Sequence, residues 1–181
     1  MKENLRIANV LLGIVATLAI LWQGFAFAQP KVGENAPSFS LKDHEGKLIN
    51  LEERKGKGWT VLFFYPKAGT PGCTKQACAF RDSVKIIRDK NAEIFGISAD
   101  SVAALAKFHK EHHLSFRLLS DESLETIDKY SGRTPQGPMA ARQTFIISPE
   151  LKVAWHEKEV DPALDAKKVA EVLQDLQKGS K

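Results

Sequence analysis

Cysteine is scarce in this 181-residue chain, which contains only Cys73 and Cys78. Two thiols cannot build a multi-bridge disulfide scaffold or the four-thiolate set of an all-cysteine zinc site. Glycine and proline number only 12 and 8, so the excess typical of fibrous and low-complexity proteins is absent. Charge of one sign does not dominate either, because the formal net charge is +4, and we expect no nucleic-acid partner. The 43% of hydrophobic residues is typical of a globular protein, and the length fits one domain.

The first 28 residues differ from the rest of the chain. A basic start precedes an apolar run over residues 7–22, and the segment ends in Ala26-Phe27-Ala28. This layout predicts a secretory signal peptide over residues 1–28, which leaves residues 29–181 as the mature domain. An alternative is an uncleaved membrane anchor over residues 7–28, whereas an ordinary helix of the folded domain would need a polar face. We therefore expect a periplasmic or otherwise exported protein, in a compartment where disulfides can persist.

Hydrophobic periodicity divides the mature domain into alternating strands and helices. The expected elements are a hairpin over 36–51, strands over 59–65, 92–98 and 116–119, helices over 73–90, 101–113 and 122–130, a strand pair over 142–148 and 152–156, and a final helix that opens at Asp161-Pro162. This order predicts an α/β domain of thioredoxin-like fold, with a central mixed sheet and helices on both faces. The closing strand pair is expected to form an antiparallel edge.

Cys73 lies where a buried strand gives way to a helix. The strand ends at Pro66, a loop rich in glycine and proline follows, and helical periodicity begins at Cys73. The unpaired N–H groups and positive potential of a helix start favour the thiolate, so we expect Cys73 to ionise more readily than a free thiol. Thr70 lies three residues earlier, where its hydroxyl can reach both the sulfur and an incoming oxygen. Pro66 and Pro71 stiffen the loop.

Cys78 follows five residues after Cys73 on the same expected helix. Five residues advance about 7.5 Å along a helix and turn the side chain to a different face. A disulfide needs Cα atoms within about 7 Å of each other and Cβ atoms that face inward. A permanent structural disulfide, the simplest interpretation of two cysteines in an exported protein, therefore conflicts with an intact helix. A reversible disulfide that forms after chemistry at Cys73 and melts the first helical turns is compatible with both observations.

Residues 66–73, Pro-Lys-Ala-Gly-Thr-Pro-Gly-Cys, resemble the P-x-x-x-T-x-x-C motif of peroxiredoxins. A second cysteine five residues later is similar to the bacterioferritin comigratory protein (peroxiredoxin Q) subfamily. Other segments resemble this family in the same order, and these are its opening at 36–43, its second and third core strands at 96–100 and 118–121, and its R-x-T-F-x-I strand at 142–147. The resemblance covers residues 31–178.

The resemblance implies a thiol-dependent peroxidase that reduces hydrogen peroxide and organic hydroperoxides. Cys73 would be the peroxidatic cysteine, oxidised to a sulfenic acid, and Cys78 the resolving cysteine that condenses with it. Thr70 would hold the peroxide, Arg142 would keep Cys73 ionised and polarise the peroxide, and Pro66 would shield the pocket. A thioredoxin-like dithiol would reduce the disulfide by exchange. No metal, haem or flavin is implied, because the cysteine carries the electrons, and we expect a monomer.

Two other functions stay open at this point. An exported thioredoxin-like thiol–disulfide oxidoreductase normally carries C-x-x-C, whereas this chain has C-x-x-x-x-C with Thr70 three residues before it. A secreted binding domain with a structural bridge would leave Thr70 and Arg142 without a role. For Cys78, an inert buried thiol is the alternative to a resolving cysteine.

Two further expectations concern the helices. Leu164 is predicted to belong to the core stripe of the last helix, together with Val169 and Leu173. Residues 109, 112 and 113 are histidines at spacings that metal ligands can have, but an H-E-x-x-H pattern is absent. We therefore predict that these histidines form a solvated face.

Overall fold

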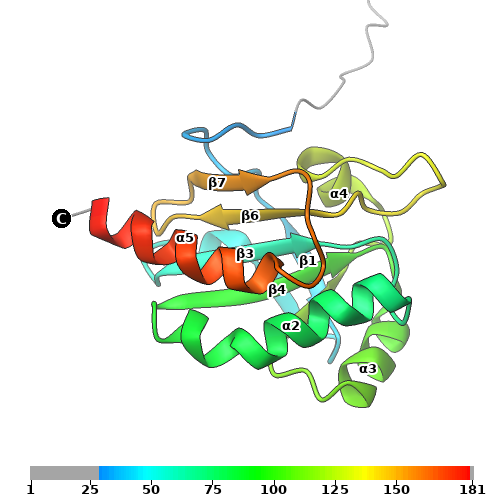
Figure 1. The fold of residues 1–181 in the computed structure, drawn as a ribbon. Coiled ribbons are helices and arrows are strands. Elements are labelled where there is room, and N and C mark those ends of the chain that lie inside the picture. The colour runs from blue at the N-terminus through cyan, green and yellow to red at the C-terminus, as the bar shows by residue number, and fades with distance from the viewer. Residues whose placement is uncertain (1–28, 180–181) are drawn as a thin grey trace, which may run out of the picture.

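A computed structural model describes residues 29–179 and forms a seven-stranded mixed sheet with helices on both faces (Figure 1). The strands are β1 (Ser40–Asp43), β2 (Leu48–Asn50), β3 (Trp59–Phe64), β4 (Ala92–Ser98), β5 (Arg117–Ser120), β6 (Gln143–Ile147) and β7 (Val153–Glu157). The helices are the 3-10 helix η1 (Leu51–Arg54), α2 (Pro71–Arg88), α3 (Val102–Glu111), α4 (Glu125–Tyr130) and α5 (Asp165–Gly179). The predicted fold class is confirmed, while the expected leader lies outside the described residues.

The sheet has the strand order β2-β1-β5-β4-β3-β6-β7. Its centre is parallel, because β3 pairs with β4 and β4 with β5 in the same direction. Both edges are antiparallel hairpins, β1 with β2 on one side and β6 with β7 on the other, as the sequence predicts. Helix α2 connects β3 to β4 and lies beside α5 on one face (Figure 1).

Strand β3 supplies side chains to both layers of the core. Its side chains alternate, so Val61 and Phe63 join the cluster beneath α2 and α5, whereas Leu62 and Phe64 join the cluster on the opposite face. Phe63 stacks on Phe80 of α2 with ring centroids 4.5 Å apart. This contact fixes the helix that carries both cysteines against the middle of the sheet.

Helix α5 begins later than expected. Asp161 forms a turn instead, in which its Oδ1 accepts the Ala163 N–H at 2.7 Å and its carbonyl accepts the N–H groups of Leu164 and Asp165. The prediction that Leu164 belongs to the core stripe is wrong, because 58% of its surface is exposed in this turn. Within residues 29–179, no helix has the length and apolar character needed to cross a bilayer.

The prediction of a solvated histidine face is wrong for His109. Its half-buried ring stacks on His44 with centroids 3.7 Å apart, which ties α3 to the turn of the first hairpin. Burial, followed by the neighbouring imidazole, lowers the pKa of His109. The part of the chain that the structure describes contains no cluster of three or more histidine, cysteine or acidic side chains that could hold a metal ion.

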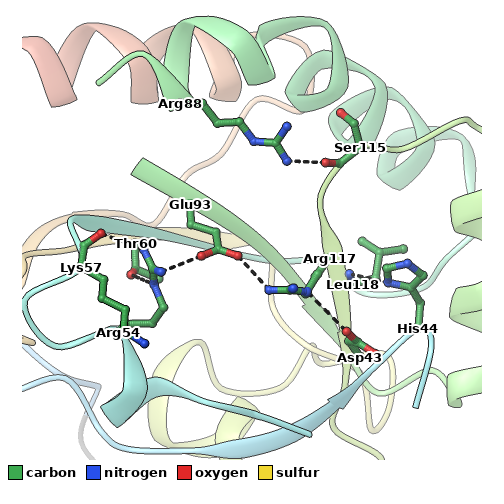
Figure 2. A network of polar contacts seen from close by, with 10 residues as sticks. All are labelled: Asp43, His44, Arg54, Lys57, Thr60, Arg88, Glu93, Ser115, Arg117 and Leu118. Carbon is green, nitrogen blue, oxygen red and sulfur yellow. Dashed lines mark hydrogen bonds and ion pairs between the residues drawn. The ribbon is translucent and has the colours of Figure 1, made fainter. Parts of the chain in front are cut away.

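A network of charges closes the end of the sheet at which β4 and β5 begin (Figure 2). Arg117 donates to Glu93 at 3.0 Å, and its Nε lies 3.5 Å from Oδ2 of the buried Asp43. The second oxygen of Glu93 lies 2.7 Å from Nη1 of Arg54. The cysteines lie at the opposite end of the sheet, beyond the carboxyl end of β3, where open α/β sheets commonly bind ligands.

Candidate active site

The loop after β3 holds the start of α2 in a defined place. The Ala68 N–H donates to Oδ2 of Asp100 at 2.8 Å, and the Ser98 hydroxyl donates to the same oxygen at 2.8 Å. Ser98 ends β4, the strand that pairs with β3 along its whole length. The loop is therefore held at the end of the sheet where β3 and β4 finish, and the first turn of α2 follows at a fixed position.

Cys73 lies in the first turn of α2 and is 1% exposed. The helix begins at Pro71, two residues earlier than predicted, which agrees with the preference of proline for a position that lacks a helical N–H partner. Thr70 is the N-cap residue, and its carbonyl accepts the Thr74 N–H at 2.8 Å. The sulfur therefore lies in the positive potential of a helix N-terminus, as the sequence indicates.

Arg142 reaches this sulfur from a different part of the chain. Its Nη2 donates to Sγ of Cys73 at 3.3 Å. The register of the sheet explains the contact, because Gln143 of β6 pairs with Phe64 at the end of β3. Arg142 therefore lies beside the strand end from which the cysteine loop departs. Its positive charge therefore lies next to the sulfur.

A buried polar chain continues from Arg142 into the core. Its Nη1 donates to Oε1 of Gln76 at 2.6 Å, and Nε2 of Gln76 donates to Oδ2 of Asp165 at 2.6 Å. The Thr144 hydroxyl donates to the same carboxylate oxygen at 2.7 Å. Burial raises the pKa of Asp165, because the charged carboxylate is poorly solvated there. The guanidinium is thus held by Gln76 on one side while it contacts Cys73 on the other.

The sequence patterns do not predict that Gln76, Asp165 and Thr144 belong to the site. A signal for Gln76 was present, since a residue three positions after Cys73 on a helix shares its face. Asp165 carries no such signal, because an acidic residue in the first turn of a helix is common and stabilising on its own. Only the packing of α5 against α2 brings its carboxylate to Gln76.

The remaining predicted site residues lie around the same loop. Thr70 is half-buried, and its hydroxyl donates to the Lys67 carbonyl at 2.9 Å, so the lone pairs of its oxygen are the groups left to accept a hydrogen bond. Pro66 is half-buried immediately after Tyr65. The structure places both residues on the segment that leads to Cys73, and their roles toward a peroxide stay predictions.

Cys78 lies on the same uninterrupted helix as Cys73, and both cysteines are free thiols. Cys78 is partly exposed, whereas Cys73 is buried. The geometry is the one expected from the spacing, in which the helix presents the two side chains on different faces. A bond between the two sulfurs requires that the turns between them open.

Comparison with known proteins agrees with this geometry. A family model described as the AhpC/TSA family matches residues 32–156. The chain is 36% identical over 155 residues to the chloroplastic peroxiredoxin Q of Triticum aestivum, which covers 84% of this chain and 71% of the relative. It is 38% identical over 141 residues to a putative peroxiredoxin bcp of Coxiella burnetii, which covers 72% of this chain and 91% of the relative.

Solved structures show the same similarity. Peroxidoxin BcpB from Mycobacterium tuberculosis superposes with a TM-score of 0.76 at 34% identity, over 82% of this chain and 99% of that one. The bacterioferritin comigratory protein of Xanthomonas campestris superposes with a TM-score of 0.71 at 27% identity, over 76% of this chain and 91% of that one. The latter structure was described in connection with alkyl peroxide reduction.

Proposed function

The chain belongs to the AhpC/TSA family and is a thiol-dependent peroxidase of the peroxiredoxin Q type, and from this premise we propose a role for each residue of the Cys73 site. The Cys73 thiolate attacks one oxygen of a hydroperoxide and breaks the O–O bond. The sulfur is oxidised to a sulfenic acid, and the departing hydroxide or alkoxide takes up a proton. The observation that carries this proposal is the contact of 3.3 Å between Arg142 and Sγ of Cys73.

Other residues around the sulfur bind the peroxide and limit the access of water. The Arg142 guanidinium holds the thiolate and offers a planar set of donors to the peroxide oxygens. The Thr70 hydroxyl donates its hydrogen bond to the Lys67 carbonyl, so its oxygen can accept a hydrogen bond from the O–H of the terminal peroxide oxygen. Pro66, at the base of the loop, limits the access of water. Hydrogen peroxide and small organic hydroperoxides are the substrates that we propose, because Cys73 is only 1% exposed.

Cys78 completes the cycle. After the turns between the two residues have unwound, its thiolate attacks the sulfenic sulfur of Cys73, a disulfide forms, and the departing hydroxide takes up a proton to become water. An external thioredoxin-like dithiol then reduces the disulfide by thiol–disulfide exchange, which restores both thiols and the helix. The partly exposed position of Cys78 supports this role over that of an inert core thiol. Within this protein, only the two sulfurs change oxidation state in the cycle, while the peroxide is reduced and the external dithiol is oxidised.

We further propose that the protein acts outside the cytoplasm as a monomer. The support for export is the basic, apolar and Ala-x-Ala order of residues 1–28. If the leader is retained, the same residues would attach the domain to a membrane. N-terminal sequencing of the exported protein decides between a chain that starts at Gln29 and an intact one, and sedimentation of the reduced protein tests the monomer.

A thiol titration tests the catalytic proposal. One equivalent of hydrogen peroxide added to the reduced protein should remove two thiols rapidly, and Cys73→Ser should abolish the reaction. Cys78→Ser should consume one peroxide and retain a sulfenic acid, detectable with a dimedone-type probe. Far-UV circular dichroism should show loss of helix on oxidation of the wild type alone. Slow and equal reactivity of both cysteines would instead favour a thiol–disulfide oxidoreductase.

A further inference from the structure

Gln76 lies between the two cysteines on α2 and connects this segment to two other parts of the fold. Its side chain is fully buried, and its amide accepts from Arg142 at 2.6 Å and donates to Asp165 at 2.6 Å. Residues 73–78 are the part of the helix that has to unwind before a disulfide can form. Both hydrogen bonds of Gln76 must therefore break when the protein passes from peroxide reduction to disulfide formation.

Asp165 holds the side-chain amide of Gln76 in one orientation. A carboxylate can only accept hydrogen bonds and a guanidinium can only donate them, so the amide between them has one arrangement that satisfies both. Oδ2 of Asp165 is fixed in turn by the Thr144 hydroxyl at 2.7 Å. Its Oδ1 is buried without a hydrogen-bond partner among the described residues. The carboxylate thus bears a desolvation cost, which hydrogen bonds from the Gln76 amide and the Thr144 hydroxyl partly offset.

We propose that Asp165 is a positioning residue that holds the segment between the cysteines in its helical form, and so favours peroxide reduction over disulfide formation. The proposal rests on the peroxidase mechanism given above. In the helical form, Gln76 steadies the guanidinium that contacts Cys73. Loss of the carboxylate leaves the buried Nε2 of Gln76 without an acceptor, which destabilises that form selectively. The two chemical steps should therefore respond in opposite directions.

Stopped-flow kinetics on the full chain can separate the two steps. Asp165→Ala should slow sulfenic acid formation about tenfold and speed the following disulfide formation by a similar factor, which is the size expected for a hydrogen bond to a charged group. Asp165→Asn keeps an acceptor oxygen and should restore both rates to within about threefold of the wild type. The faster second step should also protect Asp165→Ala from oxidation to the sulfinic acid at high peroxide.

Asp43 provides the matched control. It is equally buried, and its Oδ1 accepts two backbone N–H groups, from Glu45 and Lys47, at 2.9 Å. It belongs to the charge network at the opposite end of the sheet (Figure 2). Asp43→Ala, the same truncation at the opposite end of the sheet, should therefore leave both steps unchanged. An equal effect of Asp43→Ala and Asp165→Ala would mean that any loss of a buried carboxylate disturbs the site, and would overturn the proposal.

Hydrogen exchange of the reduced protein gives a readout that needs no peroxide. Amides of residues 73–78 should exchange faster in Asp165→Ala than in the wild type, while amides of β3 keep their protection. Gln76→Ala, which keeps a strong helix former in α2, should reproduce this change even if Asp165→Ala folds poorly. Unchanged exchange in both variants, or a slowing of both chemical steps together, would overturn the proposal. A wild type inert to peroxide would refute the peroxidase mechanism, while the exchange data would still decide whether Asp165 holds the helix.

Discussion

Nη2 of Arg142 lies 3.3 Å from Sγ of Cys73, although 69 positions separate the two residues in the chain. The contact depends on the antiparallel pairing of β6 with β3, which brings residue 143 opposite residue 64. The same guanidinium donates to Gln76 through Nη1. It therefore connects the reactive sulfur to the interior of the protein, and changes around it should alter reactivity more than stability.

Replacement of Arg142 should slow the reaction with peroxide in proportion to the donors that are lost. Arg142→Met removes the charge and both hydrogen bonds, and we expect sulfenic acid formation to slow about 100-fold. Arg142→Lys keeps a point charge that cannot serve Cys73 and Gln76 together, and a loss of about tenfold is expected. Stopped-flow fluorescence at equal peroxide concentrations measures both rates. Arg133→Lys, an exposed arginine paired with Asp128, is the control and should react like the wild type.

Gly72 restricts the position of the Arg142 guanidinium. A Cβ atom at this position would lie 3.3 Å from Nη2 of Arg142, closer than an ordinary van der Waals contact. Gly72→Ala should therefore displace the guanidinium and slow peroxide reduction several-fold, while its higher helix propensity leaves stability equal or raised by up to about 1 kcal/mol. Gly179→Ala, with no atom within 4 Å of its Cβ, makes the same change near the end of α5. A Gly72→Ala protein of wild-type activity would show that the guanidinium has room to move.

His156 should make the protein less stable in acid. Its Nε2 donates to Oε1 of Gln143 at 2.7 Å, an assignment that follows because the amide nitrogen of Gln143 already donates to the Ser131 carbonyl. Burial, followed by the charge of Lys158, lowers the pKa of His156 from 6.5 to about 4. The unfolded chain thus binds the proton more tightly, and stability should fall as the pH drops from about 6.5 to 4.

Urea unfolding at several pH values measures this dependence. His156→Gln keeps a side-chain donor but cannot titrate, so its stability should change less over the same range than that of the wild type. His113→Gln replaces an exposed histidine and serves as the control, with a profile parallel to the wild type. Parallel profiles for all three proteins would contradict the assignment of the acid sensitivity to His156.

Local patterns in the chain are sufficient to predict most of the secondary structure. The continuous apolar run that becomes β3 and the 3.6-residue spacing of Ala77, Phe80, Val84 and Ile87 in α2 each reflect burial of one element against a large neighbour. The predicted start of α5 lies four residues too early, because Asp161 and Pro162 suit a turn as well as a first helical turn. The prediction that His109 is solvated is wrong because the hairpin that covers its ring lies far away in sequence.

Two features of the site follow from the amino-acid sequence alone, namely the place of Cys73 at the start of a helix and its spacing of five residues from Cys78. These features follow from local backbone geometry, which depends on residues only a few positions apart. The chain of hydrogen bonds behind the sulfur, from Arg142 through Gln76 to Asp165, arises only from the folded arrangement of distant segments. Such contacts depend on strand register and on the packing of α5 against α2. Register and packing together must place donor and acceptor to within a fraction of an ångström before a hydrogen bond can form.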